Sequence, residues 1–170
     1  MPSGSRRPKR FSLCVQYATA VQGVPSRSQF RRWVGKALQR RAAVVIRVVD
    51  EREARALNQH FRGRNYATNV LTFPYPELKP LAGDIVLCAP VVEREAREAG
   101  KPLMAHYAHL TIHGVLHLQG HDHQEDQAAA KMEGLESRIM RALGYADPYA
   151  ARAPTHDRQR VHGKIDGRHR

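Results

Sequence analysis

Hydrophobic and polar positions alternate with two different periods along the chain, and the shorter period predicts β-strands. The segment 11–20 alternates apolar with polar or small residues, a period of two that is typical of a strand. Apolar runs rich in β-branched residues predict three more strands, at 42–50, 69–73 and 84–88. A Pro-rich turn separates the last two of these runs.

A longer period, near 3.6 residues, predicts about five helices. Ser26 is a predicted N-cap for the first, and Asp50 for the second, which should stop near Gly63. The first helix has an apolar face made of Phe30, Trp33, Val34, Ala37 and Leu38. The predicted helices span about 26–41, 50–63, 90–100, 102–120 and 125–143.

Four strands and about five helices indicate an α+β (α/β-like) fold with a single layered domain. We expect a mixed sheet of about four strands packed with these helices, and residues 11–149 as the domain. The pattern leaves the strand order open. Residues 1–10 form a basic N-terminal extension, and 150–170 a basic tail that lacks apolar periodicity and is expected to be disordered.

Composition and charge fit one globular domain with basic ends. The chain has 170 residues, 42% of them hydrophobic and 26% charged, so a core can form without disulfide bonds. Its net charge is +12, of which 1–10 contribute +4 and 151–170 another +4. Such ends attract polyanions such as RNA weakly and without sequence choice, and the alternative that they are only solvated stays open.

Several features of the sequence favour a cytoplasmic protein. A basic start before an apolar segment could be a secretion signal, but the strand-like alternation at 11–20 argues against a continuous apolar signal core. The two cysteines, Cys14 and Cys88, lie in apolar runs without CxxC spacing. They are therefore expected to be two reduced, buried thiols, which suits a reducing cytosol.

The segment 103–120 is unusual because it contains no Lys, Arg, Asp or Glu. A membrane span is one explanation for an uncharged stretch of this length. Four histidines, Thr111, Gln119 and Gly114 within it argue instead for a central, buried helix, and no membrane association is expected.

The histidines of this helix form a pattern that predicts a metal site. His106, His109, His113 and His117 fall within an arc of about 80° on one helix face. The last two are one turn apart, about 6 Å along the axis, so both rings can reach one ion. Gly120 lets the chain turn back, so that His123 can supply a third nitrogen. Three imidazoles with an open fourth position are typical of a catalytic zinc site.

Some assignments around this site stay open. His121 competes with His123 for the third position, and His106 and His109 are expected to be packing or substrate-side residues. Asp122 is either a partner that orients a ligand ring or a solvated loop carboxylate. Zinc is favoured over nickel or iron only by ligand type and availability, because imidazole accepts all three.

The spacing HxxxHxxGxxH also occurs in the metzincin proteases, whose motif is HExxHxxGxxH. Here the position of the general base is occupied by Gly114, which cannot accept a proton. Peptide hydrolysis is therefore kept only as an alternative function.

Three segments in order resemble the YbeY family of bacterial endoribonucleases and ribosomal-RNA maturation factors. They are LNQHFRGRNYATNVLTFPYPE (57–77), GDIVLCAPVVEREA (83–96) and HYAHLTIHGVLHLQGHDH (106–123). The resemblance covers roughly residues 11–145, and the histidine motif is its most specific part. Thr72 stands where the family usually has serine.

The resemblance implies a single-strand-specific, zinc-dependent endoribonuclease that matures the 3′ end of 16S ribosomal RNA and acts in ribosome quality control. It implies one zinc ion per chain on His113, His117 and His123, a functional arginine at Arg62, and no organic cofactor. The implied partners are ribosomal RNA and components of the small ribosomal subunit. A non-catalytic ribosome assembly factor is a further alternative.

The residues around Arg62 are compatible with that role. Arg62 lies at a predicted helix end beside Gly63, where a guanidinium could pair with phosphate or simply satisfy the helix dipole. Arg64 is a weaker second candidate. Thr68 and Asn69 could either bond substrate or shape the start of a strand.

Overall fold

The computed structural model of the protein describes residues 11–121 and 124–150. In these ranges the strands are β1 (Phe11–Ala18), β2 (Ala42–Val49), β3 (Val70–Pro74) and β4 (Leu81–Cys88). The helices there are α1 (Arg27–Ala37), α2 (Glu51–Arg62), α3 (Ala89–Ala99), α4 (Leu103–Leu118) and α5 (Asp126–Ala142). The predicted α+β class, with a four-stranded mixed sheet and five helices over the described residues, is confirmed.

The four strands form one sheet in the order β1-β2-β4-β3. β1, β2 and β4 run parallel to one another. β3 is the end strand next to β4 and pairs with it antiparallel. The register places Val15 beside Ile46, Ile46 beside Ile85, and Ile85 beside Thr72. This row of side chains is buried, so it forms the centre of the sheet's inner face.

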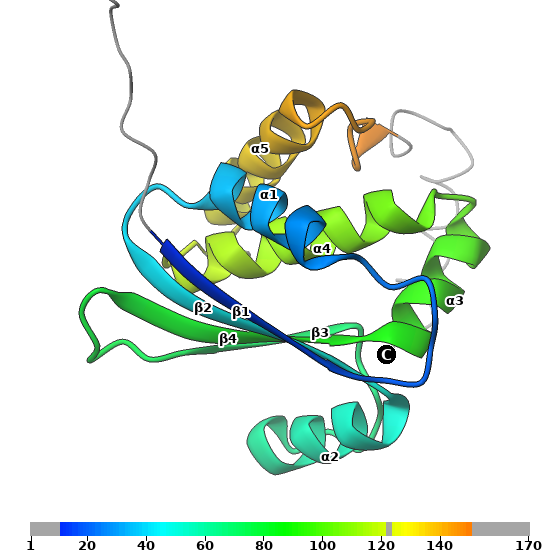
Figure 1. The fold of residues 1–170 in the computed structure, drawn as a ribbon. Coiled ribbons are helices and arrows are strands. Elements are labelled where there is room, and N and C mark those ends of the chain that lie inside the picture. Colours follow the sequence, from blue (N-terminus) through cyan, green and yellow to red (C-terminus); the bar gives the residue numbers. More distant parts are fainter. Residues whose placement is uncertain (1–10, 122–123, 151–170) are drawn as a thin grey trace, which may run out of the picture.

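The helices cover the two faces of the sheet unequally. Figure 1 shows α1 and α4 lying across one face, with α3 and α5 beside α4, while α2 lies on the opposite face. The larger core lies between the sheet and α1 and α4, and includes Trp33, Phe30 and Tyr107. A smaller core lies beneath α2, around Ala54, Leu71 and the other apolar residues that pack there.

Helix α4 is buried along most of its length, as predicted for an uncharged central helix. Gly114 allows close packing, because a Cβ atom there would lie 3.1 Å from Cδ1 of Ile85 and 3.2 Å from Cγ2 of Thr72. Leu118, one turn further on, packs so closely against Gly83 that a Cβ there would lie 2.4 Å from its Cδ2. The C-terminal half of α4 is therefore held tightly against β3 and β4. No helix among the described residues is long and apolar enough to cross a membrane.

The first two helix starts differ in how they are capped. Ser26 caps α1 as predicted, in a capping box in which its side chain accepts from the Gln29 backbone and its own N–H donates to the Gln29 side chain. Asp50 occupies the N-cap position of α2, but its side chain makes no capping hydrogen bond. It accepts from the hydroxyl of Thr19 instead. The predicted N-cap position of Asp50 is confirmed, but its carboxylate bonds to the neighbouring loop and not to the first turn of α2.

The prediction of two buried thiols is half wrong. Cys88 is buried at the end of β4, whereas Cys14 is exposed. Cys14 lies on the end strand β1, on the face opposite buried Val15. α2 packs mainly against β4, with side-chain bonds to Arg47 on β2 and Thr72 on β3. β1 lies on the other side of β2 from β4, and its outer face stays exposed at Cys14. The predicted features of residues 1–10 and 151–170 lie outside the described residues.

Candidate functional site

A cleft of about 390 Å³ lies between the end of α2, strand β3 and the C-terminal half of α4. It brings together side chains far apart in the sequence. Its lining includes His113 and His117 on one wall and Arg62 and Arg64 on the other. The other polar residues of its lining are Asn58, Tyr66, Thr68, Thr72 and Gln124. The cleft therefore unites two of the predicted metal ligands with both predicted functional arginines.

The two histidines lie side by side on α4. Their ring centroids are 6.5 Å apart and the rings are nearly parallel, with 8° between their planes. Their separation of one helical turn follows from the spacing of four residues. Both rings are half-buried and line the cleft, so they present nitrogens to the same space.

A buried carboxylate fixes one of these rings. Glu136 on α5 is fully buried, and its Oε2 lies 2.6 Å from Nδ1 of His113, while its Oε1 lies 2.7 Å from Nε2 of His109. Burial by itself raises the pKa of Glu136, but hydrogen bonds from His109, His113 and the hydroxyl of Tyr149 outweigh it and lower the pKa to about 2.

The charge of Glu136 determines which nitrogen of His113 carries hydrogen. An ionised carboxylate can only accept hydrogen bonds, so Nδ1 of His113 is the donor. The neutral ring then carries its lone pair on Nε2. A carboxylate behind Nδ1 is the partner commonly found behind a metal-ligating histidine. This arrangement fits a histidine that binds a cation through Nε2.

Arg62 is positioned by the end of its helix. It is the last residue of α2, and the following Gly63 adopts a left-handed conformation with φ 68°, which ends the helix. The Nη2 atom of Arg62 donates to the carbonyl oxygen of Thr72 on β3 at 3.1 Å. This bond ties the guanidinium to the strand that forms the floor of the cleft. The predicted position of Arg62 at a helix end facing a cleft is confirmed.

The other two histidines of the stripe are bound elsewhere. Nε2 of His106 lies 2.9 Å from Oε1 of Glu95, and His109 contacts Glu136 and the ring of Tyr149. Neither is among the residues that line the cleft with His113. Burial lowers the pKa of His106, although the Glu95 carboxylate opposes this. Within the described structure, these two histidines lie outside the cleft and line a separate pocket of about 500 Å³ between α4 and the end of α5.

The third ligand position is only partly described. His121 is half-buried, and its backbone N–H donates to the carbonyl oxygen of Leu116. Among residues 11–121 and 124–150, no group of three His, Cys, Asp or Glu side chains is placed to hold a metal ion. The choice between His121 and His123 as the third ligand therefore stays a prediction. His123, the predicted ligand, and Asp122 lie outside the described residues.

Thr68 and Asn69 differ in what they contact. Thr68 lines the cleft, while the side-chain amide of Asn69 donates to Glu95 at 3.0 Å. The carbonyl oxygen of Asn69 accepts from the backbone N–H of Cys88. Asn69 thus shapes the start of β3, and only Thr68 is placed to contact a ligand.

Sequence reasoning overlooked two residues of this site. Glu136 was not singled out, although a glutamate between Met132 and Met140, each four residues away on the buried face of α5, was a detectable signal. A buried charge needs partners, and the histidines of α4 were the obvious candidates. Tyr66 was also overlooked. It lines the cleft with 52% of its surface exposed, which no apolar periodicity could indicate.

The side chains of the cleft indicate a class of protein that binds a phosphorylated ligand. Paired imidazoles opposite two guanidinium groups, in an open cleft beside a mixed sheet, suit a phosphorylated ligand and a bound cation.

Comparison with known proteins identifies the family. The model of the family described as "Endoribonuclease YbeY" matches residues 17–144. A protein of Nitrosospira multiformis with that name is 52% identical over 168 residues, covering 88% of this chain and 89% of the relative. One from Nitrosomonas europaea is 58% identical, covering 81% and 84%, and one from Cupriavidus necator is 59% identical, covering 84% and 74%. This chain belongs to the YbeY family of endoribonucleases.

A solved structure agrees with this assignment. The solution structure of a Thermotoga maritima protein is 30% identical in sequence and superposes with a TM-score of 0.52. It covers 74% of this chain and 86% of its own. The predicted resemblance to the YbeY family is confirmed by these comparisons.

Proposed function

We propose that this endoribonuclease is single-strand-specific and zinc-dependent, and that it matures the 3′ end of 16S ribosomal RNA and acts in ribosome quality control in the cytoplasm. Endoribonucleases hydrolyse phosphodiester bonds within RNA, so the enzyme class is hydrolase and the substrate class is RNA. The partners proposed are ribosomal RNA and components of the small ribosomal subunit. The observation that carries the proposal is the opposition of His113 and His117 to Arg62 across one cleft.

The residues present fit one zinc ion per chain. His113 and His117 would hold it together with His123, which follows Gly120 after a turn of the chain. Imidazole nitrogens are ordinary zinc ligands, and three of them leave a position open for substrate or water. The bond from His113 to Glu136 supports this assignment, since it directs the other nitrogen of that ring into the cleft. When bound, zinc would supply Lewis acidity toward the phosphoryl group.

The residues of the chain supply binding and charge stabilisation. Arg62 would pair with phosphate oxygens of the scissile group and offset the negative charge that builds on them. Its bond to the carbonyl oxygen of Thr72 restricts the guanidinium before substrate arrives, which reduces the entropy lost on binding. Arg64 would attract the adjacent phosphate. Single-stranded RNA is favoured because unstacked nucleotides can enter a cleft that a duplex cannot.

The packing of α4 argues against the metallopeptidase alternative. In metzincin motifs the residue after the first histidine is the general base, and here that residue is Gly114. A Cβ atom at Gly114 would lie against Ile85 and Thr72 rather than in the cleft. The position therefore lacks a base and also lacks room for one.

The test uses purified protein and RNA that carries the 3′ end of the small-subunit RNA. We expect cleavage by the zinc-loaded protein, loss of detectable cleavage with His117→Ala, and protection when the cleaved segment is held in a duplex. Equal cleavage by both proteins would reject the proposal and indicate a contaminating nuclease. Rescue of a deletion strain by His117→Ala would favour the non-catalytic assembly factor instead.

A further inference from the structure

A second groove adjoins the cleft on the outer side of α2. It is lined by residues of α2 and of the following loop, namely Glu51, Arg52, Arg55, Ala56, Gln59, Asn65, Tyr66 and Ala67. We call it the α2 groove. Tyr66 lines both the α2 groove and the cleft that holds His113 and His117, so the two depressions share this residue.

The loop that forms one wall of the α2 groove is anchored by a buried residue. Asn58 is 2% exposed, and its side-chain amide donates to the carbonyl oxygen of Tyr66 at 2.9 Å. Its own carbonyl oxygen accepts from the backbone N–H of Arg64. These two bonds hold the backbone of the loop against α2, while the ring of Tyr66 remains 52% exposed.

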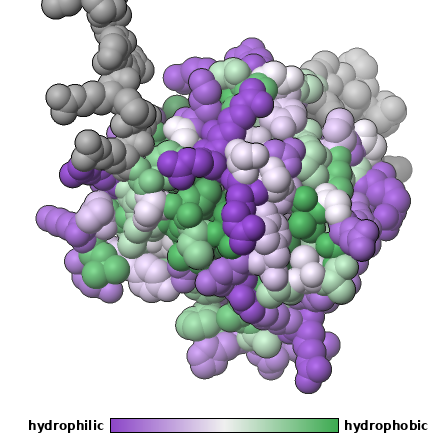
Figure 2. Space-filling view, viewed as in Figure 1, coloured by the Kyte–Doolittle hydropathy of each residue, from purple (hydrophilic) through white to green (hydrophobic). Residues whose placement is uncertain are grey.

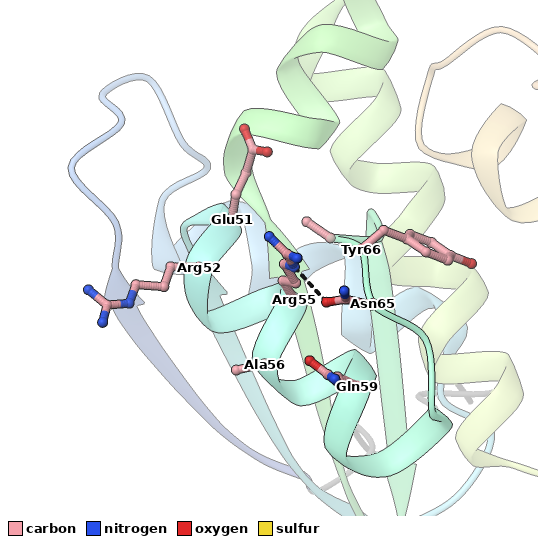
Figure 3. Close-up of a pocket in the computed structure, with 8 residues that line it drawn as sticks. Glu51, Arg52, Arg55, Ala56, Gln59, Asn65 and Tyr66 are labelled. Carbon is pink, nitrogen blue, oxygen red and sulfur yellow. Dashed lines mark hydrogen bonds between the residues drawn. The ribbon is translucent and has the colours of Figure 1, made fainter.

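An arginine in the α2 groove is also held in place. Nε of Arg55 donates to Oδ1 of Asn65 at 2.7 Å. In Figure 3 this bond spans the space between α2 and the loop, and the ring of Tyr66 extends away from the helix. The bond uses one of five N–H donors of the guanidinium, so Arg55 keeps the donors needed to bind a phosphate.

The charge of the α2 groove suits a polyanion. Arg52 and Arg55 are exposed, and the carboxylate among the lining residues, Glu51, lies 3.9 Å from the guanidinium of Arg94. The two arginines outnumber this one carboxylate, so the lining carries a net positive charge. Figure 2 shows hydrophilic side chains beside some apolar ones over α2, at the bottom of the view. This composition is unlike an apolar protein-docking surface.

We infer that the α2 groove is a second subsite for single-stranded RNA, in which a base stacks on Tyr66 and the neighbouring phosphate binds Arg55. The inference rests on the proposed function, because it assigns the path by which the substrate strand leaves the cleft. An exposed aromatic ring on an anchored loop, next to exposed arginines, matches the way sequence-tolerant single-strand sites combine stacking with backbone contacts. Arg62 and Arg64 bind the strand within the cleft, and Tyr66 and Arg55 extend its binding beyond it.

The test measures binding rather than cleavage, so that it is independent of catalysis. All variants are made in the full-length chain carrying His117→Ala, and affinity for a labelled single-stranded RNA of about 12 nucleotides is measured by fluorescence anisotropy at several salt concentrations. Tyr66→Ala should weaken binding about tenfold, since base stacking contributes that much per base, and Tyr66→Phe should restore it. The slope of log affinity against log salt should stay unchanged in both.

Arg55 gives a different, charge-specific result. Arg55→Gln should reduce the steepness of the salt dependence by about 0.7, the value for one phosphate contact on a single strand. The matched control is Arg97→Gln, which removes the same charge from α3, where the side chain is 69% exposed. It should leave the slope unchanged.

The outcomes separate this inference from the proposed function. If Tyr66→Ala and Arg55→Gln bind RNA as the parent does, while the enzyme with His117 intact cleaves RNA, the subsite is rejected and the nuclease proposal stands. If the enzyme cleaves no RNA but both variants show the expected losses, the α2 groove is an RNA site and the nuclease proposal fails. Unchanged thermal unfolding midpoints confirm that the variants fold.

Discussion

The two halves of α4 carry the same residue type on the same stripe and use it differently. In the N-terminal half, His106 and His109 are bound by Glu95 and Glu136 and pack away from the cleft. In the C-terminal half, His113 and His117 line the cleft opposite Arg62. Helical periodicity places all four rings on one face, but the neighbouring elements decide which of them can meet a ligand.

Glu136 links the two halves. One carboxylate oxygen contacts His109 and the other contacts His113. The bond to His109 lies outside the cleft, because His109 does not line it. The bond to His113 orients a ring that lines the cleft. The same buried charge therefore contributes to packing at one end and to the geometry of the site at the other.

The largest expected effect is on metal binding. His117→Ala should abolish stoichiometric zinc binding, because it removes one of three proposed ligands. His106→Ala should retain one zinc ion per chain. Metal content after dialysis, measured by atomic emission, checks both. Loss of zinc from His106→Ala in a folded protein would contradict the division of α4 into two functional halves.

Arg62 lies opposite the C-terminal half, and its replacement should affect turnover rather than metal. Arg62→Ala should lower kcat by about 10²–10³-fold, the usual effect of removing a donor to transition-state charge, with unchanged zinc content. Arg64→Ala, from the same cleft wall, should lower it by less. Equal effects of the two substitutions on kcat would show that Arg62 and Arg64 contribute only positive charge and that the position of Arg62 has no special role.

The two carboxylates allow a matched comparison of the two halves. Glu136→Gln keeps the shape of the side chain but places an amide donor against at least one of its present donors. We expect a loss of about 10–100-fold in zinc affinity, the usual effect of altering the partner behind a ligand histidine. Glu95→Gln alters the equivalent bond to His106 and should leave zinc affinity unchanged.

Nitrogen NMR of the histidine rings separates orientation from general destabilisation. In the metal-free protein, His113 should carry its hydrogen on Nδ1, and Glu136→Gln should change that population while Glu95→Gln should not. A Glu136→Gln protein that binds zinc like the parent would show that Glu136 has only a packing role.

The sequence predicted α4 and its histidines well, because both depend on local periodicity. The ends of α2 and α4 were likewise predictable from Gly63 and Gly120. The strand order was not, because an apolar run does not specify its neighbour. The bond from Glu136 to His113 joins residues 23 positions apart, and the fold, not the spacing, brings them together.

The two departures from the prediction, at Cys14 and Asp50, have tertiary causes. The apolar run around Cys14 indicated a strand correctly, but alternation within a strand buries only every second residue. Burial on the other face needs a covering helix, and α2 packs mainly against β4 rather than over Cys14 on β1. Asp50 had the right identity for a cap, yet Thr19, 31 residues away, supplies the donor that its side chain accepts from.

The smallest expected effect is a change in stability when the close contact between the C-terminal half of α4 and the sheet is disturbed. Gly114→Ala adds a Cβ atom at 3.1–3.2 Å from Ile85 and Thr72. We expect destabilisation by about 1–3 kcal/mol, the usual range for overpacking a core. The control is Gly134→Ala in α5, where a Cβ atom meets nothing within 4 Å. It should stabilise the protein by up to about 1 kcal/mol, because alanine favours a helix. Urea denaturation measures both, and a neutral Gly114→Ala would show that α4 can move away from β3 without cost.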